Sequence, residues 1–322
     1  MASVCDKLPL LDSGVDINAQ GREYGEYLDF GRQSPPDSEA DVGYYGSKYG
    51  NALQAAAYHG NIEIIRKLLD KGVDVNIQGG MYGNALQVAA FKWETEVISL
   101  LLGQGADINA QGGMYGNALQ TAAYHGNVQT IQLLLDLGAD INAQDGMYGN
   151  ALQTAAYRGN VQVISLLLDL GADINAQCGT YGNALQAAAY MGGVDVIQVL
   201  LDRGADLNAQ GGTYGNALQA AAYMGRFRVI QLLLDKGANV CSQGGKYGTA
   251  LQAALAPRPT HVGDKKDNFK IAKLLLCCGA DITTYVPGSE YGDALTAAKE
   301  LLGRHSYTLD DLLAFIKERE GI

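Results

Sequence analysis

Residues 115–147 read YGNALQTAAYHGNVQTIQLLLDLGADINAQDGM, and most of the chain consists of copies of this 33-residue stretch. The copies begin at regularly spaced tyrosines, and a lengthened step then leads to Tyr291. Their first residues are Tyr49, Tyr82, Tyr115, Tyr148, Tyr181, Tyr214 and Tyr247. A fixed period of this length predicts a solenoid, in which each repeat buries its apolar face against its neighbours.

Each unit predicts two short helices. Asn117 is a strong N-cap residue, and Gln120 at the third helical position can return a hydrogen bond to the amide of the cap. We therefore expect a first helix over residues 118–124, ended by Gly126. Apolar residues at three- and four-residue spacing predict a second helix over residues 128–137. A glycine-containing turn then leads to the next tyrosine.

This unit resembles the ankyrin repeat. Asn-Ala-Leu-Gln stands where the family usually has Thr-Pro-Leu-His, and the tail GADINA at residues 138–143 is close to the family form. The resemblance covers residues 49 to about 300 and implies an all-α ankyrin-repeat solenoid of helix–turn–helix–hairpin units, with about seven full repeats. Near-identical tandem YGNALQ units are also similar to the C-terminal arrays of fungal NOD-like receptors and to stand-alone fungal ankyrin proteins.

The two ends of the chain depart from the repeat. We expect residues 1–48 to form a degenerate N-terminal half-repeat followed by a polar linker, or else a lid that folds over the groove. The solenoid is expected to occupy residues 49–322, with a loop insertion at residues 256–268 in the seventh unit. The last unit, from Tyr291, exchanges apolar for charged residues and is expected to be a polar C-terminal cap.

Composition excludes several kinds of function. The net charge of −11 disfavours a nucleic-acid partner, because phosphate binding needs a basic face. The chain has no apolar run long enough for a membrane span, and its start has no signal-peptide pattern. Five cysteines without zinc-site spacing predict reduced thiols rather than a metal site. We expect a monomeric cytoplasmic protein without a cofactor.

Aromatic residues recur at two positions of the unit. One row consists of the tyrosines that open the repeats, and the other lies near the end of the first helices. The second row consists of Tyr58, Phe91, Tyr124, Tyr157, Tyr190 and Tyr223. The ankyrin resemblance places both rows on the concave surface that binds partners, where tyrosine suits recognition. The alternative is that the rings form a packing ladder between repeats.

The positions that vary between copies are the other candidates for contact. The residue after the helix aromatic is variable and reads His59, Lys92, His125, Arg158, Met191 and Met224. The hairpin tip varies too, with Asp145 in the third unit. Trp93 replaces the glycine that ends the first helix in the second unit. These residues either contact a partner or have drifted on an exposed face, and Trp93 either anchors a partner or covers the turn.

These patterns favour an intracellular protein–protein interaction module or scaffold that binds another protein on its concave face. The alternative is a stand-alone protein whose Tyr-lined groove binds or transforms a small molecule. For catalysis the candidates are Tyr124, His125 and Asp145, supported by Lys92 and Arg158 from neighbouring units. No nucleophile elbow, phosphate loop or metal motif accompanies them.

Overall fold

A computed structural model of the chain describes residues 50–256, 265–297, 314–315 and 317–318. The predicted N-terminal half-repeat and linker lie outside these residues, as do most of the predicted insertion and most of the predicted polar cap. The chain divides into two compact units, Met1–Ala151 and Leu152–Ile322. The boundary runs through the fourth repeat rather than between repeats.

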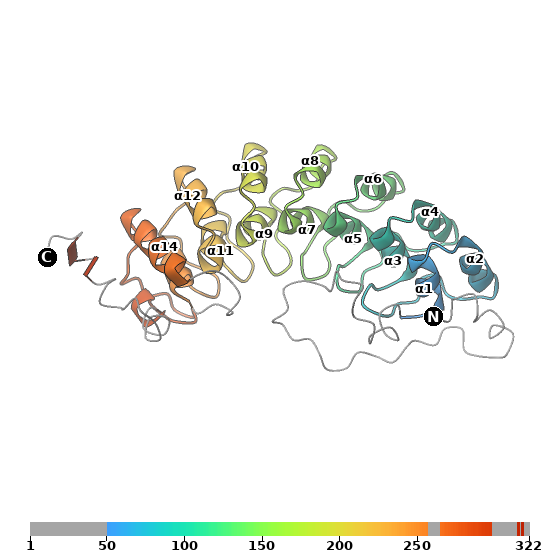
Figure 1. The fold of residues 1–322 in the computed structure, drawn as a ribbon, viewed down its shortest axis with the longest axis horizontal. Coiled ribbons are helices and arrows are strands. Elements are labelled where there is room, and N and C mark those ends of the chain that lie inside the picture. Colours follow the sequence, from blue (N-terminus) through green and yellow to red (C-terminus); the bar gives the residue numbers. More distant parts are fainter. Residues whose placement is uncertain (1–49, 257–264, 298–313, 316, 319–322) are drawn as a thin grey trace. The chain divides into compact units, whose positions relative to one another are not determined.

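The described part of the first unit consists of helix pairs, one pair for each repeat (Figure 1). Its helices are α1 (Ala52–Tyr58), α2 (Ile62–Asp70), α3 (Ala85–Lys92), α4 (Thr95–Gly103), α5 (Ala118–His125) and α6 (Val128–Asp136). The first helices pack side by side, α1 against α3 and α3 against α5, and each also packs against the second helix of its own repeat.

The second unit repeats this arrangement. Its helices are α7 (Ala151–Arg158), α8 (Val161–Asp169), α9 (Ala184–Met191), α10 (Val194–Asp202), α11 (Ala217–Met224), α12 (Phe227–Asp235), α13 (Ala250–Leu255) and α14 (Lys265–Cys277). Figure 1 shows α8, α10 and α12 in one layer and α7, α9 and α11 in the other. Helix α14 begins at Lys265, inside the predicted insertion, so the last residues of that insertion are helical.

The predicted capping explains where α5 begins and ends. The Asn117 side chain accepts a hydrogen bond from the Gln120 amide at 2.9 Å, and the Gln120 side chain accepts one from the Asn117 amide at 2.6 Å. Gly126 ends the helix with φ 75°, in the left-handed region that glycine enters at little cost. The second helix, α6, ends at Asp136, one residue before the predicted end. Both helices of the template unit are thus confirmed.

The glutamine of the capping box also joins each repeat to the next. Gln120 Nε2 donates to the carbonyl oxygens of Ala143 and Asp145, both at 3.2 Å, and to that of Gly149. All three acceptors belong to the hairpin that follows. Equivalent bonds to the next hairpin are made by Gln54, Gln87, Gln153, Gln186, Gln219 and Gln252. The residue that replaces the usual histidine of the family is therefore an inter-repeat connection.

Apolar residues of both helices form the core. Ile131 and Leu134 on α6 have no exposed surface, and neither do Ala122 and Ala123 on α5. The small alanine side chains let neighbouring first helices approach closely, while the larger aliphatic side chains fill the space between the two helix layers. Every helix among the described residues is too short or too polar to cross a bilayer.

Candidate functional site

The two aromatic rows lie mostly inside the molecule. Tyr115 of the hairpin row is 1% exposed and Tyr124 of the helix row is 2% exposed, and their ring centroids are 4.6 Å apart. Tyr124 also packs against the hairpin tyrosine of the next repeat, Tyr148, with centroids 5.4 Å apart. Phe91, Tyr190 and Tyr223 likewise contact the hairpin rings on both sides. The rows form an aromatic ladder that holds repeats together.

In the second unit, hydrogen bonds between phenol groups strengthen this ladder. The hydroxyl group of Tyr181 is hydrogen bonded to that of Tyr157, and Tyr214 is bonded to Tyr190 in the same way. Burial raises the pKa of both Tyr181 and Tyr214 far above the ordinary value, so these phenols stay protonated. The predicted binding residues Tyr157, Tyr190 and Tyr223 are between 6% and 8% exposed and offer little surface to a partner.

The first unit differs at its second repeat, where Phe91 replaces tyrosine. Phe91 and Tyr58 are both half-buried, and their rings stack with centroids 6.1 Å apart. The ring of His125 meets Phe91 edge-on at 4.5 Å. Lys92 extends over Tyr58, with Nζ 4.5 Å from the ring centroid. Since Lys92 and His59 are exposed, this corner presents two basic residues on an aromatic base.

The three predicted catalytic candidates have contacts that stabilise the fold. The Asp145 carboxylate accepts a hydrogen bond from the Gly112 amide at 3.0 Å, and the Asp145 amide donates to the Gly149 carbonyl oxygen at 2.8 Å. Asp145 therefore links two successive hairpins. Tyr124 is buried in the aromatic ladder, and the half-buried His125 ring packs on Tyr124 with centroids 5.1 Å apart. These contacts support structural roles for all three residues.

Trp93 is the most unusual residue of the first unit. It ends α3 with φ 65° and is the only non-glycine residue with positive φ in the described part of the chain. The equivalent Gly126 reaches this conformation at little cost, whereas a bulky residue held there is strained by about 1–3 kcal/mol. The Trp93 side chain is 53% exposed. The next residue, Glu94, gives α4 no side-chain cap, unlike Asn127 on α6.

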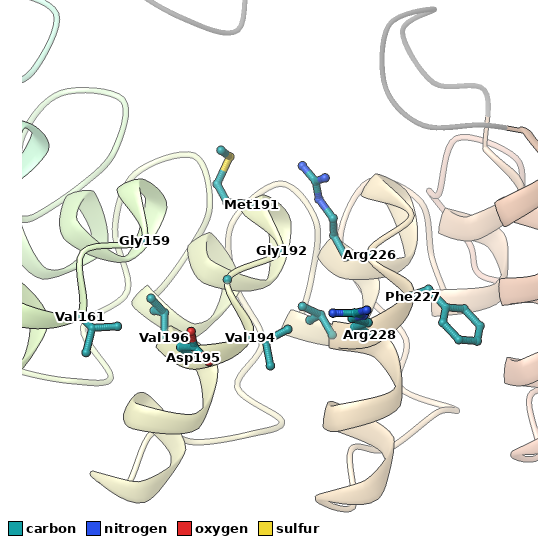
Figure 2. Close-up of a pocket in the computed structure, with 12 residues that line it drawn as sticks. Gly159, Val161, Met191, Gly192, Val194, Asp195, Val196, Arg226, Phe227 and Arg228 are labelled. Atoms are coloured by element: carbon teal, nitrogen blue, oxygen red, sulfur yellow. The ribbon is translucent and has the colours of Figure 1, made fainter.

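The second unit contains a hollow of about 530 Å³ at the turns between first and second helices (Figure 2). It is lined by the turn residues Met191 to Gly193, by the first turn of α10 and by residues 226–229. Figure 2 shows Met191 and Arg226 projecting from the same side of these turns. Arg226 Nε donates to the carbonyl oxygen of Tyr190 at 3.0 Å, which fixes the guanidinium at one edge of the hollow.

Of the remaining predicted residues, Arg158 and Met191 are exposed in the second unit and Met224 is buried. Sequence reasoning missed Gly193, Arg226 and Arg228. The signal for two of them was present, because the first, third and fourth repeats have Gly-Asn at this turn, whereas the fifth has Gly-Gly and the sixth Gly-Arg. Over the residues that the structure describes, histidine, cysteine and acidic side chains form no cluster that could hold a metal ion.

Comparisons with known proteins agree with this architecture. The family model for ankyrin repeats in three copies matches residues 36–112, 53–145 and 119–211, and the model for a single ankyrin repeat matches residues 216–244. A search of curated proteins gave no match. The matched residues span well over half of the chain and coincide with the helix pairs, the capping boxes and the hairpins described above. The chain belongs to the ankyrin-repeat family.

Proposed function

We propose that the chain is a protein–protein interaction module, and that its first unit binds a partner protein through His59, Lys92 and Trp93, here called the turn strip. Ankyrin repeats support protein–protein interaction in general. The observation that carries the proposal is Trp93, a large apolar side chain that is 53% exposed on a strained backbone. Backbone strain at an exposed residue points to function, and tryptophan is enriched among residues that dominate binding energy.

Charge around Trp93 supports the same conclusion. Lys92 and His59 are exposed beside it, and helices α1, α3 and α5 contain no acidic residue, although the half-buried Glu94 places one carboxylate next to Gly60. The chain as a whole carries a net charge of −11, so this basic surface stands out against an acidic molecule. Such a patch favours a partner that has acidic groups near an apolar contact residue. Complementary charge raises the association rate of such a partner and disfavours partners of like charge.

The buried aromatic ladder weighs against the alternative of a Tyr-lined groove for a small molecule. That reading needs Tyr124 and Tyr157 to face a ligand, and both rings are covered by neighbouring repeats. The exposed turn residues are better suited to a broad, shallow contact. Because the surface is built on rigid helix ends, little ordering of the chain would oppose binding.

A capture experiment tests the proposal. The variant His59→Ala, Lys92→Ala, Trp93→Gly removes the turn strip, and the control Arg66→Ala, Lys67→Ala removes two exposed charges from α2 instead. We expect proteins bound by the native chain to be bound equally by the control and lost from the strip variant. Equal capture by all three chains would refute the proposal. Circular dichroism of each chain checks that the fold is intact.

A further inference from the structure

The hollow in the second unit exists because two neighbouring repeats lack the usual turn asparagine. In the fourth repeat Asn160 caps α8 by accepting from the Val163 amide at 3.0 Å. Gly193 occupies this position in the fifth repeat and has no side chain to place there, although its backbone, φ −77° and ψ 86°, matches that of Asn160, φ −87° and ψ 90°. A side chain would fit, since a Cβ at Gly193 would approach Val196 no closer than 3.4 Å. The space is therefore open rather than filled by packing.

The sixth repeat places positive charge at the edge of this space. Arg226 lies across Gly192, where a side chain would collide with it: a Cβ on that glycine would be 2.9 Å from the arginine Cδ. Only Nε of Arg226 is used, in the bond to Tyr190, and among the described residues its two Nη groups have no hydrogen-bond partner. Arg228 is exposed and also lines the hollow. Two guanidinium groups thus border a site that has one acid, Asp195.

The rest of the lining is apolar. Val161 and Val194 contribute aliphatic surface, and Phe227 and Met191 are each 37% exposed at its rim. A guanidinium with free Nη groups binds a carboxylate through two parallel, charge-assisted hydrogen bonds. The apolar wall would contact an apolar side chain next to that carboxylate. The single acid, Asp195, would repel an occupant with many negative charges.

From these features we infer that the hollow binds a short peptide segment of a partner protein in which one acidic residue stands beside an apolar residue. The inference rests on the proposed function, that the chain binds other proteins, and adds a second contact site in the other unit. The Nη groups of Arg226 pair with the carboxylate, Arg228 adds positive charge to the same hollow, and Val194 contacts the apolar side chain. The hollow is open and wide, which suits a peptide lying across the turns.

Oriented peptide libraries test this inference on the full chain. The probe is a pool of N-acetylated, C-amidated heptapeptides with glutamate fixed at the centre, and matched pools carry glutamine or lysine there. We expect the native chain to retain the glutamate pool about tenfold better than the glutamine pool, as a charge-assisted pair implies. Apolar residues should be enriched next to the glutamate. Equal retention of the glutamate and glutamine pools would overturn the inference.

Two variants locate the binding. Gly193→Asn restores the side chain of the sister repeats and narrows the hollow at its centre, while Arg226→Gln with Arg228→Gln removes its positive charge. Each should lower retention of the glutamate pool to the level of the glutamine pool. The control Arg203→Gln removes an exposed arginine paired with Asp169, outside the hollow, and should leave retention unchanged. Undiminished retention by Gly193→Asn or by the double variant would overturn the inference.

The outcome is separable from that of the proposed function. The turn strip lies in the other unit and is tested by capture of partner proteins, so loss of capture by the strip variant upholds the proposed function whatever the libraries show. If the glutamate pool is retained no better than the glutamine pool while the strip variant loses capture, the peptide site in the hollow is refuted and the proposed function stands. If the strip variant also captures partners as the native chain does, the proposed interaction module is refuted as well.

Discussion

Replacing Gln120 by alanine should be among the most damaging single changes in this chain. The side chain is 1% exposed and has four hydrogen-bond partners. Its oxygen accepts from the Asn117 amide at 2.6 Å, and its nitrogen donates to the carbonyl oxygens of Ala143, Asp145 and Gly149. All four groups would remain buried or half-buried without this partner, and the third repeat would lose its side-chain connection to the next hairpin.

The expected cost follows from counting these bonds. A typical internal hydrogen bond contributes about 1 kcal/mol net. Because the two N–H groups of Nε2 are shared among three carbonyl oxygens, the side chain makes three full bonds, which amount to about 3 kcal/mol. Alanine is an excellent helix former, so the cost does not come from α5 itself. Equilibrium unfolding in urea, followed by circular dichroism, measures the change. We also expect a broader transition, because a solenoid with a weakened internal interface unfolds less cooperatively.

Gln132→Ala provides the matched control. Gln132 lies on α6 and donates to Asp136 at 2.8 Å in an exposed pair, so its loss should change the free energy of unfolding by less than about 0.5 kcal/mol. If Gln120→Ala costs less than about 1 kcal/mol more than Gln132→Ala, the inter-repeat role of the buried glutamine is refuted.

Three further predictions concern stability. The free energy of unfolding should fall as the pH rises through 10, because Tyr181 and Tyr214 have raised pKa values when folded and lose protons near pH 10 when unfolded. Between pH 9 and pH 11 the two phenols should account for a loss of about 3 kcal/mol, and urea titrations that give the same value at both pH values would contradict this. Gly193→Asn should raise the free energy of unfolding by about 1 kcal/mol through a restored cap and a less flexible unfolded chain, and a lower thermal midpoint would count against it. Gly126→Ala should lower it by about 1–2 kcal/mol, because alanine is strained at φ 75°, and an unchanged urea midpoint would show that the turn relaxes.

Much of the fold could be predicted because one short pattern determines each element. Asn117 and Gln120 stand three residues apart before an apolar run, which defines the start of α5, and Gly126 defines its end. The aliphatic spacing of residues 128–137 predicts α6 to within one residue. The repetition of these patterns also predicts how units stack. The second function of Gln120, in joining repeats, could not be predicted, because its acceptors lie 23 to 29 residues away.

The candidate site was less predictable. Periodicity places Tyr124 near the hairpin tyrosines, but it does not show whether the rings pack together or face solvent, and the structure buries them. The hollow was missed because it depends on two changes in different repeats. Gly193 opens the space and Arg226 provides the charge, and each looks like neutral variation by itself. Trp93 was singled out because it breaks a glycine position, which is visible in the sequence without any structure.

The most direct test replaces the deviant turn of the second repeat by the turn sequence of the third repeat. Lys92→His, Trp93→Gly and Glu94→Asn together give this turn the sequence of residues 125–127 in the third repeat. We predict a chain that folds with an intact helical spectrum and has lost at least about tenfold in affinity for the partner captured by the native chain, measured by titration calorimetry. A folded chain that keeps the native affinity would show that the departures from the repeat are not where this protein binds.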